Sequence, residues 1–242
     1  MRSIITCLLF VAASLSIHAQ QKVIYDAHAE KRAVSAFHAI RVSQGITLIM
    51  EQGGEEALAI SADKKEYGDA VKTEVVNGEL RIYIEQSLNK WWQQLKKKGI
   101  DVKAYVSFKT LDKLDASSGA EVKINGSLSG QKLGISLSSG AVIKGEMKLT
   151  QLKIDQSSGA RSDLSGQVQN LQVTASSGAH FRGYQLIVQE SEADASSGGK
   201  IEITVNKQLE VSASSGGAIT YRGEGRISSV KTGSGGKVRR AG

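Results

Sequence analysis

A short phrase, Ser-Ser-Gly followed by Ala or Gly, recurs through the second half of the chain and constrains its fold more than any other feature. Successive copies are 18 to 21 residues apart, and a degenerate Gly-Ser-Gly copy closes the series. The copies begin at Ser117, Ser138, Ser157, Ser176, Ser196, Ser214 and Gly233. A repeat of this length is typical of a solenoid, in which each unit buries its apolar side by stacking on its neighbours.

Apolar residues alternate with polar ones inside each repeat. The positions five, three and one before the phrase are Leu133, Ile135 and Leu137 in one copy, and Leu171, Val173 and Ala175 in another. A period of two is the period of a β-strand, not of a helix. The repeats therefore predict an all-β protein, a right-handed parallel β-helix-like solenoid over residues 111–242, with one coil per repeat of about 19 residues.

The alternation, continued through the phrase, turns the second Ser and the following Ala or Gly toward the interior. The second serines are Ser118, Ser139, Ser158, Ser177, Ser197 and Ser215. A buried hydroxyl needs a partner, and the Ser of the next coil would lie roughly 4.8 Å away. We therefore predict a structural Ser column inside the solenoid, although a positive φ at the Gly would shift this phase.

A second column is expected on the outside. It consists of Asp115, Ser136, Asp155, Thr174, Asp194 and Ser212. Because the carboxylates alternate with hydroxyls, like charges would stand roughly 10 Å apart, too far for two of them to share one cation. The glycine-rich spacing of calcium-binding β-rolls is also absent. The sequence therefore predicts no metal and no cofactor.

Residues 20–110 continue the strand pattern without the Ser-Ser-Gly phrase. Short alternating runs surround Ile40, Leu48, Ile60, Val75 and Ile82, and turn signals occur at residues 53–54 and 77–78. The whole chain contains no Pro, which suits strands whose every amide donates to a neighbour. We expect this region to form the opening coils of the solenoid or a cap on it.

Residues 86–100 interrupt the strand pattern. Leu88, Trp92 and Leu95 lie at helical spacing, so a short amphipathic helix ending at Gly99 is predicted. Two interpretations remain open: an insertion that packs its aromatic side across the sheet or a solenoid end, and a contact site for an anionic surface or a sugar. The residues of such a site would be Trp91, Trp92, Lys96, Lys97 and Lys98.

Residues 1–19 have the composition of a secretory signal peptide. Arg2 precedes an apolar run that is too short to span a membrane, and Ala19 is a small residue at the expected cleavage site. The only cysteine, Cys7, lies in this segment, so the mature chain should contain no disulfide. We expect an exported protein without a transmembrane segment, located in the periplasm, on the outer surface or in the medium.

The positive charge of the chain is local. The formal net charge is +7, and two stretches without acidic residues account for the excess: residues 86–100 and the tail after Glu224. An exported chain with no recognition-helix or RNA-binding signature is a poor match for nucleic acid. The basic isoelectric point therefore does not indicate a nucleic-acid partner.

The residues that catalyse reactions are sparse and scattered. Beyond residue 19 the histidines are His28, His38 and His180, which are isolated in sequence, and neither a His-Glu-x-x-His nor a Gly-x-Ser-x-Gly motif occurs. One active site needs one activated Ser beside a base, so serines that recur in every coil indicate architecture. We expect a non-enzymatic protein. The alternative is a polysaccharide-active lyase or hydrolase, which would gather carboxylates and a Lys or Arg base on one face.

Five segments carry a further pattern, and the repeated Ser-Ser-Gly phrase is its most specific part: residues 37–42, 45–50, 77–82, 102–106 and 111–120. Together they resemble the head GIN domain family of exported proteins, which is common in Bacteroidetes and is described as auto-transporter adhesins. The resemblance spans nearly all of the mature chain and implies an exported β-helical protein. It brings no catalytic motif. We therefore expect an envelope or cell-surface adhesin that binds a polysaccharide, an anionic envelope surface or another protein through its solenoid faces.

Overall fold

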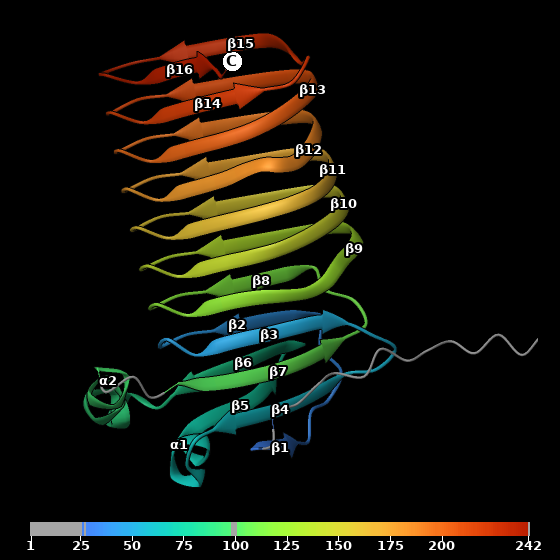
Figure 1. Ribbon diagram of the computed structural model, residues 1–242, viewed down its shortest axis with the longest axis vertical. Helices are drawn as coiled ribbons and strands as arrows, with labels where there is room; N and C mark the ends of the chain where they lie inside the picture. Colours follow the sequence, from blue (N-terminus) through green and yellow to red (C-terminus); the bar gives the residue numbers. More distant parts are fainter. Residues whose placement is uncertain (1–25, 27, 98–100, 242) are drawn as a thin grey trace, which may run out of the picture.

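The computed structural model describes residues 26, 28–97 and 101–241, which form a solenoid of stacked β-strands (Figure 1). The predicted all-β solenoid is confirmed, whereas the predicted signal peptide, 1–19, lies outside the described residues. The strands are β1 (Ala29–Arg32), β2 (Ala39–Val42), β3 (Thr47–Gln52), β4 (Ala57–Ala62), β5 (Val71–Val76), β6 (Glu79–Ile84), β7 (Val102–Phe108), β8 (Lys113–Ala116), β9 (Glu121–Leu137), β10 (Val142–Gln156), β11 (Arg161–Ala175), β12 (His180–Ala195), β13 (Lys200–Ala213), β14 (Ala218–Arg222), β15 (Arg226–Thr232) and β16 (Lys237–Arg240). The helices are α1 (Lys65–Asp69), the 3-10 helix η1 (Gln86–Leu88) and α2 (Asn89–Lys97).

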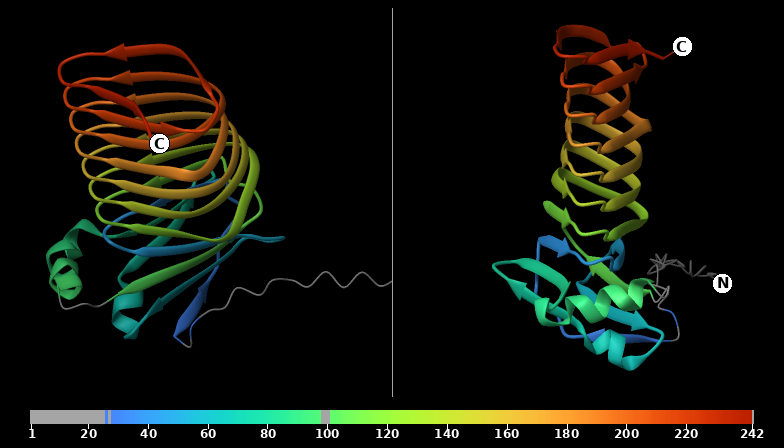
Figure 2. Two further views of the ribbon diagram at one scale, coloured as in Figure 1. Left: turned by 45° about the horizontal axis from the view of Figure 1, so that its top comes forward. Right: turned by 90° about the vertical axis from the view of Figure 1, so that its left-hand side faces the viewer.

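Each strand from β9 to β13 runs from one Ser-Ser-Gly turn to the next and bends around the core on the way (Figure 2). Neighbouring strands pair in parallel, so equivalent residues stack. One such inward column contains Leu133, Leu152, Leu171 and Leu209, all buried. The predicted alternation is therefore confirmed, and apolar burial along these columns stabilises the stack.

Two sides of the coil meet at the turn. We call the outward residues in the last six positions of a strand, such as Glu190 to Asp194 in β12, the pre-turn face. We call the outward residues in the first three positions, such as His180 and Arg182, the post-turn face. The predicted outward column that contains Asp155 and Thr174 lies in register on the pre-turn face.

The predicted orientation of the Ser column is wrong. The Ala residues that follow the phrase are buried as expected. The six serines, however, are exposed at the tips of the turns: Ser118, Ser139, Ser158, Ser177, Ser197 and Ser215. The reason is that the second Ser and the Gly both have positive φ, 51° at Ser158 and 73° at Gly159. Together with the hydrogen bond from the Ala160 amide to the Ser157 carbonyl, 3.0 Å, this describes a tight two-residue turn of the hairpin type. The strand alternation therefore stops at the first Ser and restarts at the Ala.

Backbone hydrogen bonds join the turns of successive coils. The amide of each turn Gly donates to the carbonyl of the second Ser in the next coil, for example from Gly119 to Ser139 at 2.9 Å and from Gly159 to Ser177 at 3.1 Å. The stack of turns is thus held by the main chain, and the Ser side chains point away from it.

Substitutions at Ser158 test this turn geometry. The left-handed region costs an ordinary residue about 1–2 kcal/mol, and Asn tolerates it better than Ser. We expect Ser158→Asn to raise the free energy of unfolding by up to about 1 kcal/mol, and Ser158→Val to lower it by about 1 kcal/mol because β-branched residues are strained there. Thermal and urea unfolding of both variants would measure the difference, and equal stability of the two would argue against the turn.

The N-terminal coils are stacked out of sequence order. β2 lies between β6 and β8, and β3 lies between β7 and β9, all in parallel. Residues 43–46 join β2 to β3 through a turn in which Gln44 and Gly45 have φ of 54° and 67°, as in the Ser-Ser-Gly turns. The coil that is first in the chain is therefore enclosed by two coils that follow it.

The strands β4 and β5 cover the outer side of this region. They pair antiparallel with β7 and β6, respectively, and α1 joins them. β1 adds antiparallel to β4. Reversed strands interrupt the parallel stacking, so this end of the solenoid is closed by its own chain (Figure 1).

Candidate functional site

The predicted insertion replaces the turn of one coil. β6 pairs with β2 and β7 pairs with β3, so β6 and β7 form the coil next to that of β2 and β3, and the residues that connect β6 to β7 stand where this coil would have its turn. In this place the chain forms η1 and α2, on the same side of the molecule as the stacked turns (Figure 1). The predicted helix is confirmed over α2, while its predicted end at Gly99 lies outside the described residues.

Trp92 fastens α2 to the solenoid. Its side chain is only 2% exposed and shares its side of the helix with Leu95, which is also buried. The indole Nε1 donates to the carbonyl of Gln44 at 2.6 Å. Gln44 is the turn residue equivalent to the second Ser, so the indole donates where a turn Gly would donate in the other coils. Trp92 therefore packs α2 against the solenoid and takes the place of the turn Gly at the N-terminal end of the stack of turns.

Trp91, the preceding residue of α2, points to another side of the helix and is 36% exposed. Its ring centroid is 5.9 Å from that of the buried Tyr67, and Lys64 Nζ lies 5.7 Å from the Tyr67 ring. Lys90 and Lys97 are exposed on the same helix. We call Lys64, Lys90, Trp91 and Lys97 the α2 surface. Of the other residues singled out in the sequence, Lys96 is part of α2 and Lys98 lies outside the described residues.

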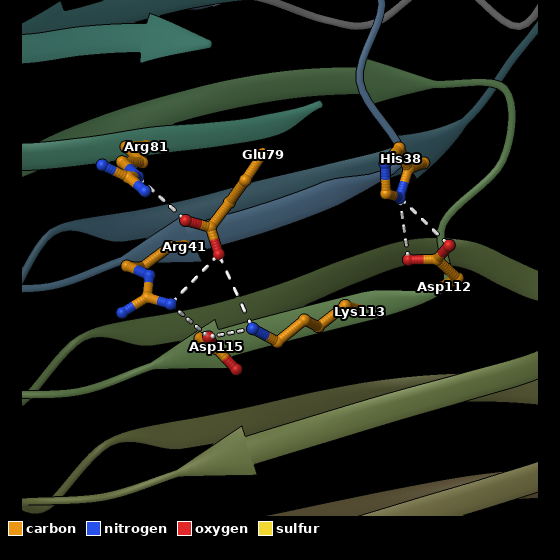
Figure 3. Close-up of polar contacts among 7 residues, drawn as sticks. All are labelled: His38, Arg41, Glu79, Arg81, Asp112, Lys113 and Asp115. Carbon is orange, nitrogen blue, oxygen red and sulfur yellow. Dashed lines mark hydrogen bonds and ion pairs between the residues drawn. The ribbon is translucent and has the colours of Figure 1, made fainter. Parts of the chain in front are cut away.

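A network of ion pairs covers the pre-turn face of the N-terminal coils (Figure 3). Arg41 on β2 pairs with Glu79 on β6 at 3.1 Å and with Asp115 on β8 at 2.9 Å. Arg81 pairs with Glu79 at 2.9 Å, and Lys113 pairs with Asp115 at 3.0 Å. The charges therefore link the three strands that stack out of sequence order, which makes this network an architectural feature.

The network changes the pKa of Glu79. Burial alone would raise the pKa, but hydrogen bonds from Arg41 and Arg81 and the charge of Lys113 outweigh it, so the pKa of Glu79 lies below its ordinary value. The ionised carboxylate is thus favoured by folding. Its contribution to stability is present above the ordinary pKa of a Glu and is lost as the pH falls through the lowered value.

A comparison of the wild type with Glu79→Gln should show this dependence. At about pH 6 we expect the variant to be less stable by about 1 kcal/mol, because Arg41 and Arg81 lose their carboxylate partner. The loss is no larger because Arg41 is half exposed, so water screens its ion pair. Toward about pH 3, below the ordinary Glu value of about 4.3, the difference should shrink. Urea unfolding at a series of pH values measures it, and a constant difference would contradict the assignment.

The histidines lie in three separate places. His28 is exposed, His38 Nδ1 lies 3.0 Å from Asp112 on the surface (Figure 3), and His180 Nε2 lies 3.5 Å from Glu202 on the post-turn face. Burial lowers the pKa of His180, and the neighbouring Arg182 and Lys200 add to this, against the opposing effect of Glu202. Within residues 26, 28–97 and 101–241, no three His, Cys, Asp or Glu side chains gather as they would around a metal ion.

The sequence of the chain decides its family. Residues 36–225 match the family described as "Putative auto-transporter adhesin, head GIN domain". The chain belongs to the head GIN domain family. The resemblance inferred from the Ser-Ser-Gly phrase and the N-terminal segments is thereby confirmed. No match was found among curated proteins.

Solved structures of low sequence identity share the head GIN domain fold. A putative adhesin from Bacteroides fragilis has a TM-score of 0.76 at 17% identity, covering 88% of this chain and 96% of that one. A putative lipid binding protein from Parabacteroides distasonis (0.66, 17% identity, 90% and 98% covered) and a putative adhesin from Parabacteroides merdae (0.66, 16%, 88% and 95%) are also similar. These likenesses establish the fold. In the part of the chain that the structure describes, no helix has the length and apolarity of a membrane span.

Proposed function

We propose that this protein is an exported, non-enzymatic adhesin of the cell envelope and that the α2 surface binds an acidic polysaccharide. The observation that carries the proposal is the partly exposed indole of Trp91. It lies beside Tyr67, over whose ring Lys64 extends, on a helix that also carries the exposed Lys90 and Lys97. Family membership and the adhesin names of its structural neighbours support the general class of function.

The chemistry of the α2 surface fits such a ligand. An aromatic face provides a flat apolar platform for a sugar ring, and ammonium groups attract carboxylates or sulfates. α2 contains lysines and no acidic residue in its first turn. Trp92 fixes the helix from below, so Trp91 is presented on a rigid element, which reduces the entropy lost on binding.

The test removes the indole and the lysines of the α2 surface in turn. Trp91→Ala should weaken binding to acidic polysaccharides immobilised from bacterial envelopes at least about tenfold, which corresponds to about 1.4 kcal/mol. The variant should stay folded, as circular dichroism would show. Lys90→Ala with Lys97→Ala should weaken binding mostly at low salt. Neutral polysaccharides serve as the control ligand.

Two results would reject the proposal. Binding that survives Trp91→Ala would place the contact elsewhere, and release of shortened or unsaturated products from any polysaccharide during the assay would contradict the non-enzymatic part. The signal peptide is tested separately, by following the cellular fraction that holds the chain with and without residues 1–19.

A further inference from the structure

The C-terminal end of the solenoid exposes part of its core. In the preceding coils the inward columns are buried. No member of one such column is more than 3% exposed from β9 to β13: Ile135, Ile154, Val173, Ala193 and Val211. Val230 on β15 continues this column and is 51% exposed. Ile227, which continues the column of Leu209, is half-buried. The last coil therefore presents apolar side chains that one more strand would cover.

The backbone of this coil is open on the same side. β15 pairs only with β13, and β16 pairs only with β14, so no strand in the described part of the chain pairs with their outer edges (Figure 1). An edge of unpaired N–H and C=O groups is a template for another strand. This end of the solenoid therefore favours an extended partner, whose own N–H and C=O groups can pair with the edge.

The charges at this end are nearly all positive. From residue 218 onward the chain has six cations and one acid, Glu224. On β15, Arg226 and Lys231 are exposed, and neither forms an ion pair with any of the described residues. The stretch of β13 that pairs with β15 contains one acid, Glu210, whose register position lies between the two cations. A strand laid on β15 would therefore meet two unpaired cations and no carboxylate on β15 itself.

These charges argue against a second copy as the partner. Pairing two β15 edges would bring the cations of both molecules onto adjacent strands, where like charges destabilise the pairing. At the other end of the molecule, β1 and β5 carry three cations and two acids between them, so a copy offers no excess of negative charge there. Cations on an edge prevent such self-pairing. The same cations attract a strand that carries carboxylates, so they both exclude one partner and select another.

We propose that the edge of β15 binds an acidic β-strand of a different protein, which adds to the solenoid as a further strand. The apolar side chains of this strand cover Ile227 and Val230, and its carboxylates, on the other face, pair with Arg226 and Lys231. In this mode of recognition main-chain hydrogen bonds supply affinity and the alternating side chains supply specificity. The edge lies at the opposite end of the solenoid from the α2 surface, so the two sites are separate (Figure 1).

The contact of a single strand should be weak and sensitive to salt. β15 has seven residues, which gives roughly 23 Å of strand. A partner strand of this length covers much less than the about 800 Å² per partner of a stable interface. The attraction between carboxylates and the two cations of β15 therefore contributes a large share of the affinity, and salt screens it.

Synthetic peptides test the proposal. The first alternates Glu and Val over about eight residues, within the usual range of strand lengths. The second replaces each Glu by Lys, and the third is the first peptide with every backbone amide methylated, which keeps the charge but removes the donors. Fluorescence anisotropy measures binding at about 0.1 M and about 1 M salt, where the Debye length is about 10 Å and about 3 Å. Hydrogen exchange of the protein locates the contact.

Two double variants of the protein assign the charges. Arg226→Glu with Lys231→Glu reverses the charge of β15. Arg161→Glu with Arg182→Glu makes the same change at exposed cations of β11 and β12 and serves as the matched control. Circular dichroism shows that both variants are folded.

The acidic peptide should bind the wild type and the control variant, at least about tenfold more tightly at the lower salt. It should slow amide exchange in β15. The methylated peptide should bind neither protein. The Lys peptide should bind only the variant with the reversed β15, because that exchange restores opposite charges across the edge.

Four results would overturn the proposal. The first is a wild type that does not bind the acidic peptide, and the second is a reversed variant that does not bind the Lys peptide. The third is equal binding of the methylated peptide, which would reveal a general attraction of anions without strand pairing. The fourth is a wild type that dimerises at low salt through amides of β15, since a second copy would then be the occupant.

Discussion

Replacing Trp92 with Ala should destabilise the protein by about 3–5 kcal/mol, the usual cost of deleting a buried Trp side chain. The side chain is 2% exposed and packs with Leu95 beneath α2. Its removal leaves a cavity and also leaves the Gln44 carbonyl without the 2.6 Å hydrogen bond from the indole. The free energy of unfolding, measured in urea, should fall accordingly.

Two further variants separate the parts of this effect. Trp92→Phe keeps most of the packing and loses the donor, so it should cost about 1 kcal/mol beyond the loss of volume. Trp91→Ala, one residue away and 36% exposed, should cost clearly less than Trp92→Ala, because only part of the indole is buried. A Trp92→Ala protein within about 1 kcal/mol of the wild type would show that α2 is not fastened as described.

Replacing Gly199 with Ala should destabilise the protein by about 1–3 kcal/mol, the cost of overpacking a close-packed interior. The position follows the Ser-Ser-Gly phrase, where Ala120, Ala141, Ala160 and Ala179 stand in earlier coils. A methyl group at Gly199, however, would lie 2.1 Å from the carbonyl oxygen of Ala175 and 2.6 Å from its carbon. Both are backbone atoms and cannot move aside without disturbing the preceding coil.

The reverse change in the neighbouring coil provides the control. Ala179→Gly removes a buried methyl group and adds backbone freedom, and should cost about 0.5–1 kcal/mol. A column argument from the sequence predicts the opposite order, because Ala is the commoner residue at this position. Thermal unfolding that shows Gly199→Ala to be as stable as the wild type would favour the column argument over the structure.

The repeat spacing and the alternation were sufficient to predict the coils, because both follow from the geometry of stacked strands. The Ser column was placed on the wrong side because the alternation was carried through a turn. Ser158 and Gly159 occupy the two positions with positive φ, where Asn-Gly is the familiar pair, and this similarity is the signal that could have revealed the turn. The first turn was missed because Gln44 replaces the second Ser.

The order of the N-terminal coils could not be predicted from the sequence. Ser43 and Ser117, which begin neighbouring turns, are separated by residues that form another coil and the reversed strands, so no fixed spacing relates them. The roles of the two tryptophans were equally inaccessible, since Trp91 and Trp92 are adjacent and chemically identical. Only the helix phase distinguished them, and their exposures of 36% and 2% come from the packing of α2 on Gln44.

The enclosure of the β2 and β3 coil by later parts of the chain implies a direction for assembly. That coil cannot acquire both neighbours until β6, β7, β8 and β9 have formed, so the chain up to β9 must fold as one cooperative unit with many distant contacts, which is a slow step. Each later coil needs only the one before it and can add in turn. We therefore expect coils to be gained or lost readily near the C-terminal end, where the length of the solenoid can vary, while deletions near the N-terminal end should prevent folding altogether.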